Sequence, residues 1–159
     1  LRLKKINREN VWNILKLEVS DDQKSFVATN GISIIEAYTA ITENGYAFPF
    51  AIYEDDIPVG FLMIGYDADD YWYDAPKIAK GNYNLWRLMI DKNYQGKGLG
   101  KEAIRLALDF INTFPCGIGE YCWLSYEAEN DVTRQLYSSF GFVETGEKDG
   151  EELIAVLKL

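Results

Sequence analysis

The part of the sequence that most constrains the fold is residues 84–111, where a strand-like segment leads through a glycine-rich turn into a helix-like segment. Residues 84–91 are largely apolar, and residues 94–101 read Tyr-Gln-Gly-Lys-Gly-Leu-Gly-Lys. Residues 98–111 repeat apolar side chains at helical spacing, which predicts an amphipathic helix. A glycine turn at this place leaves free backbone N–H groups at the positive end of the helix dipole, where phosphate binds well.

Two lysines in the turn, Lys97 and Lys101, strengthen the expectation of an anionic ligand. The glycines let the chain turn sharply and let a ligand approach the backbone. Two common phosphate-binding motifs do not fit. A Walker A loop needs Ser or Thr after the lysine, where Glu102 stands, and the dinucleotide motif needs Gly-x-Gly-x-x-Gly instead of alternating glycines. A turn that only tightens the packing of the helix stays open as an alternative.

The other segments predict further elements of a single domain over residues 1–159. Apolar residues on both faces of 57–66 indicate a central strand that begins near Pro58. Asn10 is the expected cap of the first helix, and residues 146–150 are expected to form a turn. The pattern predicts strands at 1–6, 46–53, 57–66, 84–91, 120–126 and 151–158, and helices at 10–19, 32–43, 98–111 and 130–139.

Charge and composition exclude several classes of function. The net charge of -9 argues against a nucleic-acid or anionic-membrane partner. Because the chain has no histidine, Ser-His-Asp triads and histidine-ligated metals are excluded, and we expect no metal. Cys116 and Cys122 match no zinc or redox motif, so we expect reduced thiols. We find no signal peptide or membrane-spanning run, and we expect a cytoplasmic protein.

Two segments together resemble the GNAT N-acetyltransferase family. Gln95-Gly96-Lys97-Gly98-Leu99-Gly100 is similar to that family's Gln/Arg-x-x-Gly-x-Gly/Ala motif, and Asn130, Tyr137 and Gly141-Phe142 are spaced as in its downstream segment. Two motifs in the right order are much more specific than either alone, and the resemblance covers residues 46–158. It implies an α/β (α+β) acyltransferase fold with a central, mainly antiparallel mixed sheet, splayed at the cofactor site and flanked by helices.

The resemblance implies that acetyl-CoA is the cosubstrate. The glycine turn is expected to hold the pyrophosphate through backbone amides, and the preceding strand is expected to pair with the pantetheine arm and polarise the thioester carbonyl. Alternatively, the side chains of this strand only fill the core. The residues assigned to cofactor binding are Leu88, Met89, Ile90, Gln95, Gly96, Lys97, Gly98, Leu99, Gly100, Lys101 and Asn130.

Tyr137 aligns with the tyrosine that protonates the departing thiolate in this family. A phenol can do so because its pKa lies not far above that of a thiol; a structural tyrosine is the alternative. Asn130 is expected to cap its helix and bind the cofactor arm. Several polyamine acetyltransferases of the family carry an acidic residue where Trp86 stands. Glu127 is therefore the substitute candidate for the general base, on position alone. A solvated surface glutamate is the alternative.

The segment 66–74 places four aspartates among four aromatic residues. Carboxylates attract ammonium groups and aromatic faces bind cations, while a solvated loop is the alternative. The chain also resembles bacterial spermine/spermidine acetyltransferases through the segment 90–101. We therefore expect direct acetyl transfer to a small cationic primary amine such as spermidine or spermine. Its expected contacts are Asp69, Asp70, Tyr71, Tyr73 and Trp86.

Functions of other classes stay open. A non-catalytic acyl-CoA-binding or sensing module would fit the tryptophan at position 86. Protein amines and aminoglycosides are alternative acceptors, because an acidic loop would attract them as well. Members of the family often form homodimers, but no segment of this sequence decides whether this chain does.

Overall fold

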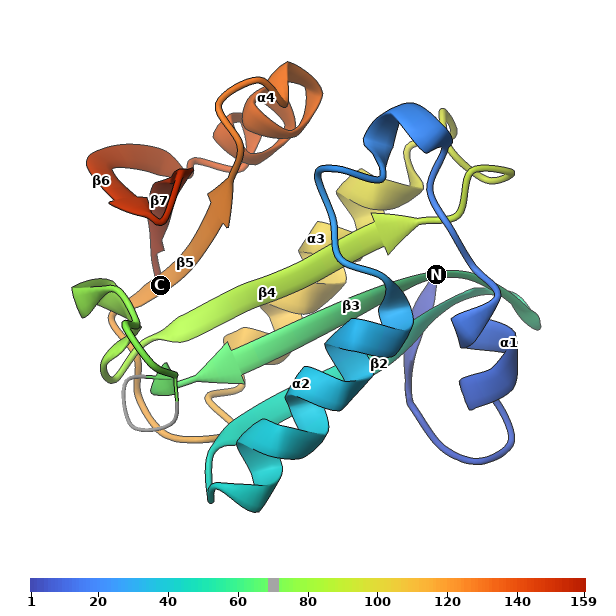
Figure 1. The fold of residues 1–159 in the computed structure, drawn as a ribbon, viewed down its shortest axis with the longest axis horizontal. Helices are drawn as coiled ribbons and strands as arrows, with labels where there is room; N and C mark the ends of the chain where they lie inside the picture. The colour runs from blue at the N-terminus through green and yellow to red at the C-terminus, as the bar shows by residue number, and fades with distance from the viewer. Residues whose placement is uncertain (69–71) are drawn as a thin grey trace.

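The computed structural model describes residues 1–68 and 72–159, and all of its strands join one seven-stranded sheet (Figure 1). Neighbouring strands are antiparallel except for β4 and β5, which are parallel. The mainly antiparallel mixed sheet expected from the sequence is confirmed. Across the sheet the order is β1-β2-β3-β4-β5-β7-β6. The strands are β1 (Arg2–Lys5), β2 (Tyr46–Glu54), β3 (Ile57–Tyr66), β4 (Tyr83–Ile90), β5 (Tyr121–Tyr126), β6 (Val143–Asp149) and β7 (Glu152–Lys158).

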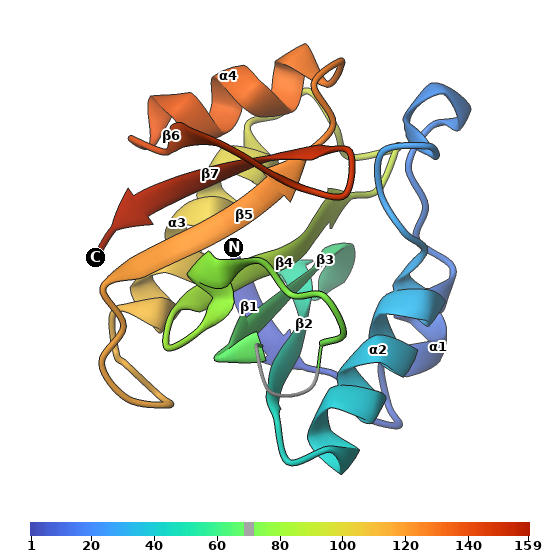
Figure 2. The same cartoon turned by 60° about the vertical axis from the view of Figure 1, so that its left-hand side comes forward.

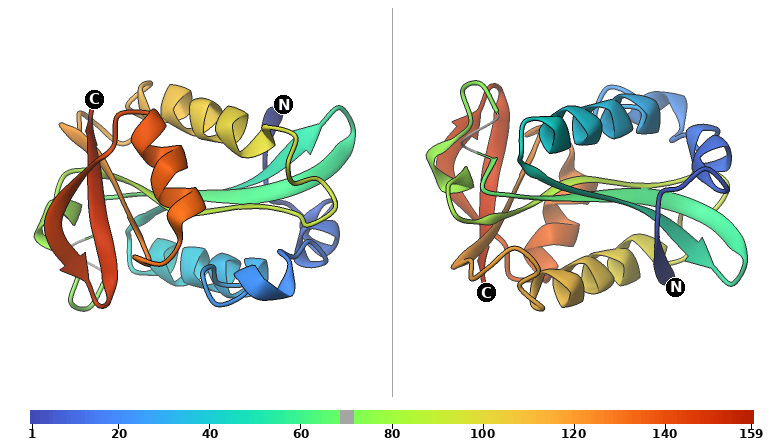
Figure 3. Two further views of the ribbon diagram at one scale, coloured as in Figure 1. Left: turned by 90° about the horizontal axis from the view of Figure 1, so that it is seen from above. Right: turned by 90° about the horizontal axis from the view of Figure 1, so that it is seen from below.

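Helices cover both faces of the sheet (Figures 2 and 3). α1 (Val11–Leu15) and α2 (Asn30–Thr42) lie on one face, and α3 (Leu99–Ile111) and α4 (Asp131–Ser139) lie on the other. Short 3-10 turns occur at 21–23 and 77–79. One buried cluster packs α3 against the sheet and a second packs α1 and α2 against it.

The central strand predicted at 57–66 and the helix after the glycine turn are confirmed. β3 lies between β2 and β4 and buries side chains on both faces, among them Phe61 and Leu62. α3 buries the apolar stripe that the sequence predicts, while Arg105 and Asp109 are outside the buried set. The spacing of apolar residues was sufficient to predict these two elements, because each has one consistent apolar pattern.

The first helix is shorter than expected and is not capped by Asn10. It ends at Leu15 instead of residue 19. The amide of Asn10 donates to Lys5 O (3.0 Å), and its Oδ1 accepts from Asn7 N (2.9 Å). Asn10 therefore fixes the turn between β1 and α1, a role that its cap-like position in the sequence did not reveal.

The buried face of α2 differs from the one that its large apolar residues indicate. Small residues such as Ala37 and Ala40 face the sheet, and Asn30 is also buried. Ile35, Tyr38 and other large residues are exposed. Small side chains let the helix lie close to β2, so close packing decides the orientation of α2 instead of the number of apolar atoms.

Strand β6 was missed by the sequence analysis. It spans Val143–Asp149 and pairs with β7 across an irregularity between Glu144 and Lys148. The expected turn at 146–150 therefore begins within a strand. Every residue of β6 before Asp149 is exposed, so this edge strand has no apolar alternation to reveal it.

Gly60→Ala should reduce the free energy of unfolding by about 2 kcal/mol, because β3 and β4 approach closely there. A Cβ on Gly60 would lie 2.4 Å from Met89 O and 3.0 Å from Ile90 Cδ1. Urea unfolding followed by circular dichroism measures the change. The end of β4 should also shift, since Gly60 pairs with Ile90.

Gly31→Ala is the matched control. A Cβ on Gly31 in α2 would lie 3.4 Å from Leu15 Cδ2 of α1, an ordinary van der Waals contact. We expect a change of less than about 1 kcal/mol. Equal losses in the two variants would contradict the close approach of β3 and β4.

Candidate active site

β4 and β5 separate after two residue pairs. Tyr83 lies opposite Cys122 and Asn84 lies opposite Trp123, and the described strands share no further pair (Figure 1). Beyond this point the edge of β4 that faces β5 has no strand partner. Backbone N–H and C=O groups on such an edge are available to a ligand.

A β-bulge lies beside this separation. The register with β3 shifts between the Met63–Arg87 and Ile64–Leu85 pairs, so Trp86 is the extra residue of β4. A bulge bends a strand and redirects its side chains. Trp86 packs against the buried cluster under α1 and α2 and also lines the space between the separated strands.

A cavity of about 830 Å³ occupies that space, a volume in the range of cofactor sites. Its walls are the segment 19–28, β4, the glycine turn with the start of α3, the end of β5, and α4. The structure thus brings together most of the residues assigned from the sequence. Those that line the cavity are Trp86, Leu88, Met89, Ile90, Gln95, Gly96, Gly98, Leu99, Gly100, Glu127, Asn130 and Tyr137.

The glycine turn has the conformation that its composition indicates. Gly96 and Gly98 both have φ of +79°, which side chains disfavour. Gly98 directly precedes α3, whose first N–H groups have no acceptor within the helix. These amides and the helix dipole make this end of the cavity electropositive.

Lys97 and Lys101 do not line the cavity. Both side chains are exposed, and Lys97 Nζ lies 5.5 Å from the centre of the Tyr94 ring. Their charges therefore act on the turn from outside the lining, where solvent screens them.

The turn is anchored by a side chain that the sequence analysis had treated only as part of the motif. Gln95 Nε2 donates to Ile90 O (2.9 Å) and to Gln23 Oε1 (2.9 Å). The first bond joins the turn to the end of β4. The second joins it to the 19–28 wall of the cavity.

A buried carboxylate holds the same region together. Asp91 is 4% exposed; one of its oxygens accepts from Glu18 N, and the other accepts from Asn93 N and Nδ2, all at 3.0 Å. Hydrogen bonds compensate its burial. Asp91 thus positions the end of β4, and no sequence motif pointed to this role.

Asn130 and Tyr137 lie at opposite ends of α4. Asn130 Oδ1 accepts from Thr133 N (3.3 Å), so the expected cap is present. Tyr137 lines the cavity and stacks on Tyr126 at 6.1 Å between ring centres. Burial raises the pKa of Tyr137 well above its usual value, so the phenol is protonated at neutral pH and releases its proton less readily than an exposed tyrosine.

The two cysteines are unsuited to nucleophilic catalysis. Both are free thiols. Burial raises the pKa of Cys116 to about 11 and that of Cys122 to about 12. At neutral pH the reactive thiolate is therefore scarce at either position.

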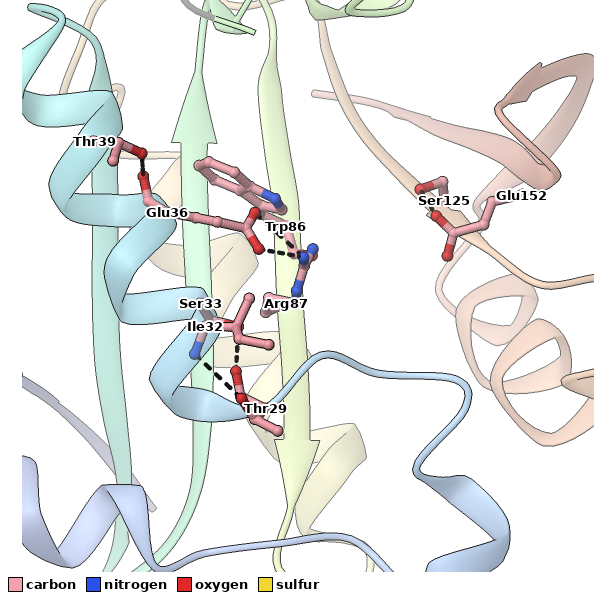
Figure 4. A network of polar contacts seen from close by, with 9 residues as sticks. All are labelled: Thr29, Ile32, Ser33, Glu36, Thr39, Trp86, Arg87, Ser125 and Glu152. Atoms are coloured by element: carbon pink, nitrogen blue, oxygen red, sulfur yellow. Dashed lines mark hydrogen bonds and ion pairs between the residues drawn. The ribbon is translucent and has the colours of Figure 1, made fainter. Parts of the chain in front are cut away.

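Polar pairs on the two walls of the cavity were missed by the sequence analysis (Figure 4). From β4, Arg87 pairs with Glu36 of α2, with Nη2 3.0 Å from Oε1. From β5, Ser125 Oγ donates to Glu152 Oε2 of β7 at 3.0 Å. Each pair joins residues far apart in sequence, so only the folded chain could reveal it.

Of the residues expected to contact the acceptor, Trp86 and Tyr73 lie among the described residues, and Trp86 lines the cavity. The ring of Trp86 stacks on Trp72 at 5.3 Å. Tyr73 is 92% exposed and is not part of the cavity wall. Asp69, Asp70 and Tyr71 lie outside the described residues.

Comparison with known proteins identifies the family of this chain. The profile described as "Acetyltransferase (GNAT) family" matches residues 9–142. The chain belongs to the acetyltransferase (GNAT) family. It is 31% identical to the probable spermine N(1)-acetyltransferase of Bacillus subtilis subsp. natto (strain BEST195), over 97% of this chain and 96% of that protein. It is 30% identical, with the same coverage, to the spermine/spermidine N(1)-acetyltransferase of Bacillus subtilis (strain 168).

Solved structures of low sequence identity share the GNAT fold. Aminoglycoside acetyltransferase AAC(6')-Ib in complex with coenzyme A has a TM-score of 0.75 at 13% identity, with 98% of this chain and 93% of that chain covered. The PaiA N-acetyltransferase of Thermoplasma acidophilum in complex with coenzyme A has a TM-score of 0.67 at 15% identity, with 99% and 98% covered.

The GNAT chain is therefore an N-acetyltransferase that uses acetyl-CoA, and its cavity fits that cosubstrate. A Cβ on Gly96 or Gly98 would meet nothing within 4 Å, so the turn is open to an approaching anion. The free edge of β4 offers hydrogen bonds to an extended amide arm. Acetyl-CoA supplies the acetyl group as a thioester. Among the described residues no cluster of carboxylates and thiols could hold a metal ion.

Gly98→Ala should weaken acetyl-CoA binding by about tenfold, because relief of the left-handed strain, about 1–2 kcal/mol, would move the amides of the turn. Isothermal titration calorimetry measures the affinity. The free energy of unfolding should fall by a similar amount in urea.

Gly100→Ala is the control variant, because it adds a methyl group in the same segment without the backbone strain expected at Gly98. Gly100 is helical, and a Cβ there would lie 3.8 Å from Leu136 Cδ2, so we expect unchanged stability. Full acetyl-CoA affinity in Gly98→Ala would show that the turn geometry does not determine binding.

Proposed function

We propose that this GNAT enzyme acetylates a primary amine of a small polycation such as spermidine or spermine, by direct transfer in a ternary complex. The charge of the cavity carries the proposal. Its two cationic lining residues are already paired, Lys24 with Asp21 and Arg87 with Glu36. Five lining carboxylates have no ion pair among the described residues: Asp22, Glu127, Glu129, Asp131 and Glu152.

An excess of carboxylates in a cavity attracts a multiply charged cation and raises its local concentration. The Trp86 ring, stacked on Trp72, adds an aromatic face in the same cavity, and such faces bind ammonium groups. Two relatives at 30–31% identity are named for spermine or spermidine, which supports the same class of acceptor.

In this proposal the chain supplies orientation and proton transfer. The free edge of β4 around Leu88 to Ile90 orients the acetyl donor, and its amides polarise the reacting carbonyl. Asn130 binds the cofactor arm in addition to capping α4. Tyr137 donates its proton to the departing sulfur. Glu127 is the general-base candidate expected from the sequence, and it lines the same cavity.

We further propose a cytoplasmic location. The two free cysteines support it, because unpaired thiols are usual in reducing compartments. Among the described residues no helix is long and apolar enough to cross a membrane.

Thiol release from acetyl-CoA should be fastest with spermidine and spermine. The comparison uses a monoamine, an aminoglycoside and a lysine peptide under the same conditions. We expect at least tenfold higher kcat/KM for the polyamines, because their second charge interacts with the unpaired carboxylates. The preference should weaken at high salt.

Two other outcomes of the thiol-release comparison would change the proposal. A preference for the aminoglycoside or the peptide would replace polyamines with that acceptor. Acetyl-CoA binding without amine-dependent thiol release would favour the sensing module instead.

Tyr137→Phe should lower kcat by about 100-fold and leave acetyl-CoA affinity nearly unchanged, because the ring still packs but no longer donates a proton. Tyr126→Phe is the matched control: its hydroxyl donates to Glu144 (2.9 Å) and has no assigned role in transfer. Stopped-flow thiol release measures both variants. Equal, small effects would make Tyr137 a structural residue.

A further inference from the structure

We propose that Glu152, at the start of β7, accepts the proton that the acceptor ammonium must lose before its nitrogen can attack. The inference rests on the proposed function only in requiring an amine as acceptor, and it holds for any amine. It assigns the base to a residue outside the glycine motif and the Tyr137 segment.

The position of Glu152 suits this role. β7 pairs with β5, so the start of β7 lies beside the part of β5 that has separated from β4. Glu152 and Ser125 both line the cavity. Figure 4 shows Glu152 across the space from Trp86 and Arg87, the residues at the β4 bulge. A carboxylate here reaches the acceptor from the wall opposite β4.

The orientation of Glu152 is fixed by a hydrogen bond. Ser125 Oγ donates to Glu152 Oε2 at 3.0 Å, which leaves Oε1 without a protein donor among the described residues. Glu127 also lines the cavity, but in the described parts of the chain, 1–68 and 72–159, its side chain has no hydrogen bond or ion pair. A base that is already oriented loses less conformational freedom when it meets its substrate.

The surroundings favour protonation of Glu152. Burial raises its pKa, and the nearby carboxylates of Asp149 on β6 and Glu127 after β5 raise it further. The Ser125 bond and the charge of Arg87 on β4 act in the opposite direction, and Arg87 is itself paired with Glu36 of α2. A carboxyl group with a raised pKa is a stronger base than an exposed glutamate.

The proton balance of the reaction is complete with this assignment. A substrate ammonium loses two protons when it becomes an amide. The first N–H bond breaks as the proton passes to Glu152, which frees the lone pair to form the N–C bond while the C–S bond breaks. The second proton ends on the sulfur, donated by way of Tyr137. Glu152 returns its proton to solvent, so the net products are the amide, the thiol and one proton.

Glu152→Gln tests the assignment, because the amide keeps the size of the side chain and can still accept from Ser125. We expect kcat/KM for spermidine to fall by about 100-fold at pH 7. The loss should shrink as pH rises toward the pKa of a primary amine, about 10.4, where the neutral amine no longer needs a base. Glycinamide, a much weaker base than spermidine, should show a smaller loss.

Glu147→Gln is the matched control, because Glu147 is exposed on β6 and does not line the cavity, and we expect it to stay within about threefold of the unchanged enzyme at every pH. The melting temperature and acetyl-CoA affinity of both variants should be unchanged. A loss in Glu152→Gln that is equal at pH 7 and pH 9.5 would overturn the proposal and leave Glu152 as an electrostatic binding residue. So would a pH-dependent loss that appears in Glu127→Gln instead.

A second measurement does not depend on turnover. In protein labelled with ¹³C at glutamate carboxyls, the Glu152 signal, identified by its loss in Glu152→Gln, should titrate at higher pH than the other glutamates. A midpoint near 4.3, the value of an unperturbed glutamate, would overturn the proposal even if no amine of the panel were acetylated. If the polyamines alone failed in that panel, Glu152 would be tested with the amine that reacts.

Discussion

The whole site depends on the two residue pairs at which β4 and β5 still hold each other. Next to these pairs, hydrogen bonds hold the start of β4 to the segment that leads into β5. The buried Tyr83 hydroxyl donates to Gly117 O (2.7 Å) and accepts from Cys116 N (3.1 Å). Asn82 Oδ1 accepts from Tyr121 N (3.0 Å). Above them, the polar groups on one edge of β4 face a cavity. Unpaired backbone groups are tolerated only where water or a ligand can meet them. The separation therefore creates a binding edge and requires that it stay accessible.

The two ends of the cavity have opposite electrostatic character. At one end, the glycine turn presents amides and the positive end of the α3 dipole, which favours the anionic part of acetyl-CoA. On the wall formed by β5 and β7, the carboxylates of Glu127 and Glu152 have no ion pair among the described residues. Arg87 would oppose a cation at this wall, but Glu36 neutralises it. The cosubstrate and a cationic acceptor can thus occupy one cavity without competing for the same charges.

The cavity wall made by the glycine turn, α3 and α4 could be predicted from the sequence because these segments are local. The turn at 95–101 and α3 are consecutive, and their glycines and apolar period are visible in one short segment. Asn130 and Tyr137 belong to one helix and could be placed by a second short motif. A short segment of sequence is enough to predict these features, because backbone conformation and helix capping are determined by residues close in the chain.

The polar pairs on the β4 and β5 walls of the cavity could not be predicted in this way. The Ser125–Glu152 and Arg87–Glu36 pairs depend on strand order and on the bulge at Trp86, and a single sequence encodes neither directly. Glu152 lies in the strand predicted at 151–158, but no motif marks it, and its contact with Ser125 joins residues that are far apart in the sequence. The buried face of α2 is likewise not evident from the sequence pattern, because close contact with β2 favours Ala37 and Ala40 over larger residues.

The aromatic contact at the bulge has an optical consequence. Trp72 lies 5.3 Å from Trp86 of β4 and 6.0 Å from Trp123 of β5, so three of the four tryptophans bridge the two strands near the point of separation. The fourth, Trp12, is 69% exposed. Indole rings at such separations exchange excitation energy and quench one another, whereas Trp12 emits from solvent. The intrinsic fluorescence of the protein consequently reports on the distance between β4 and β5, without any added label.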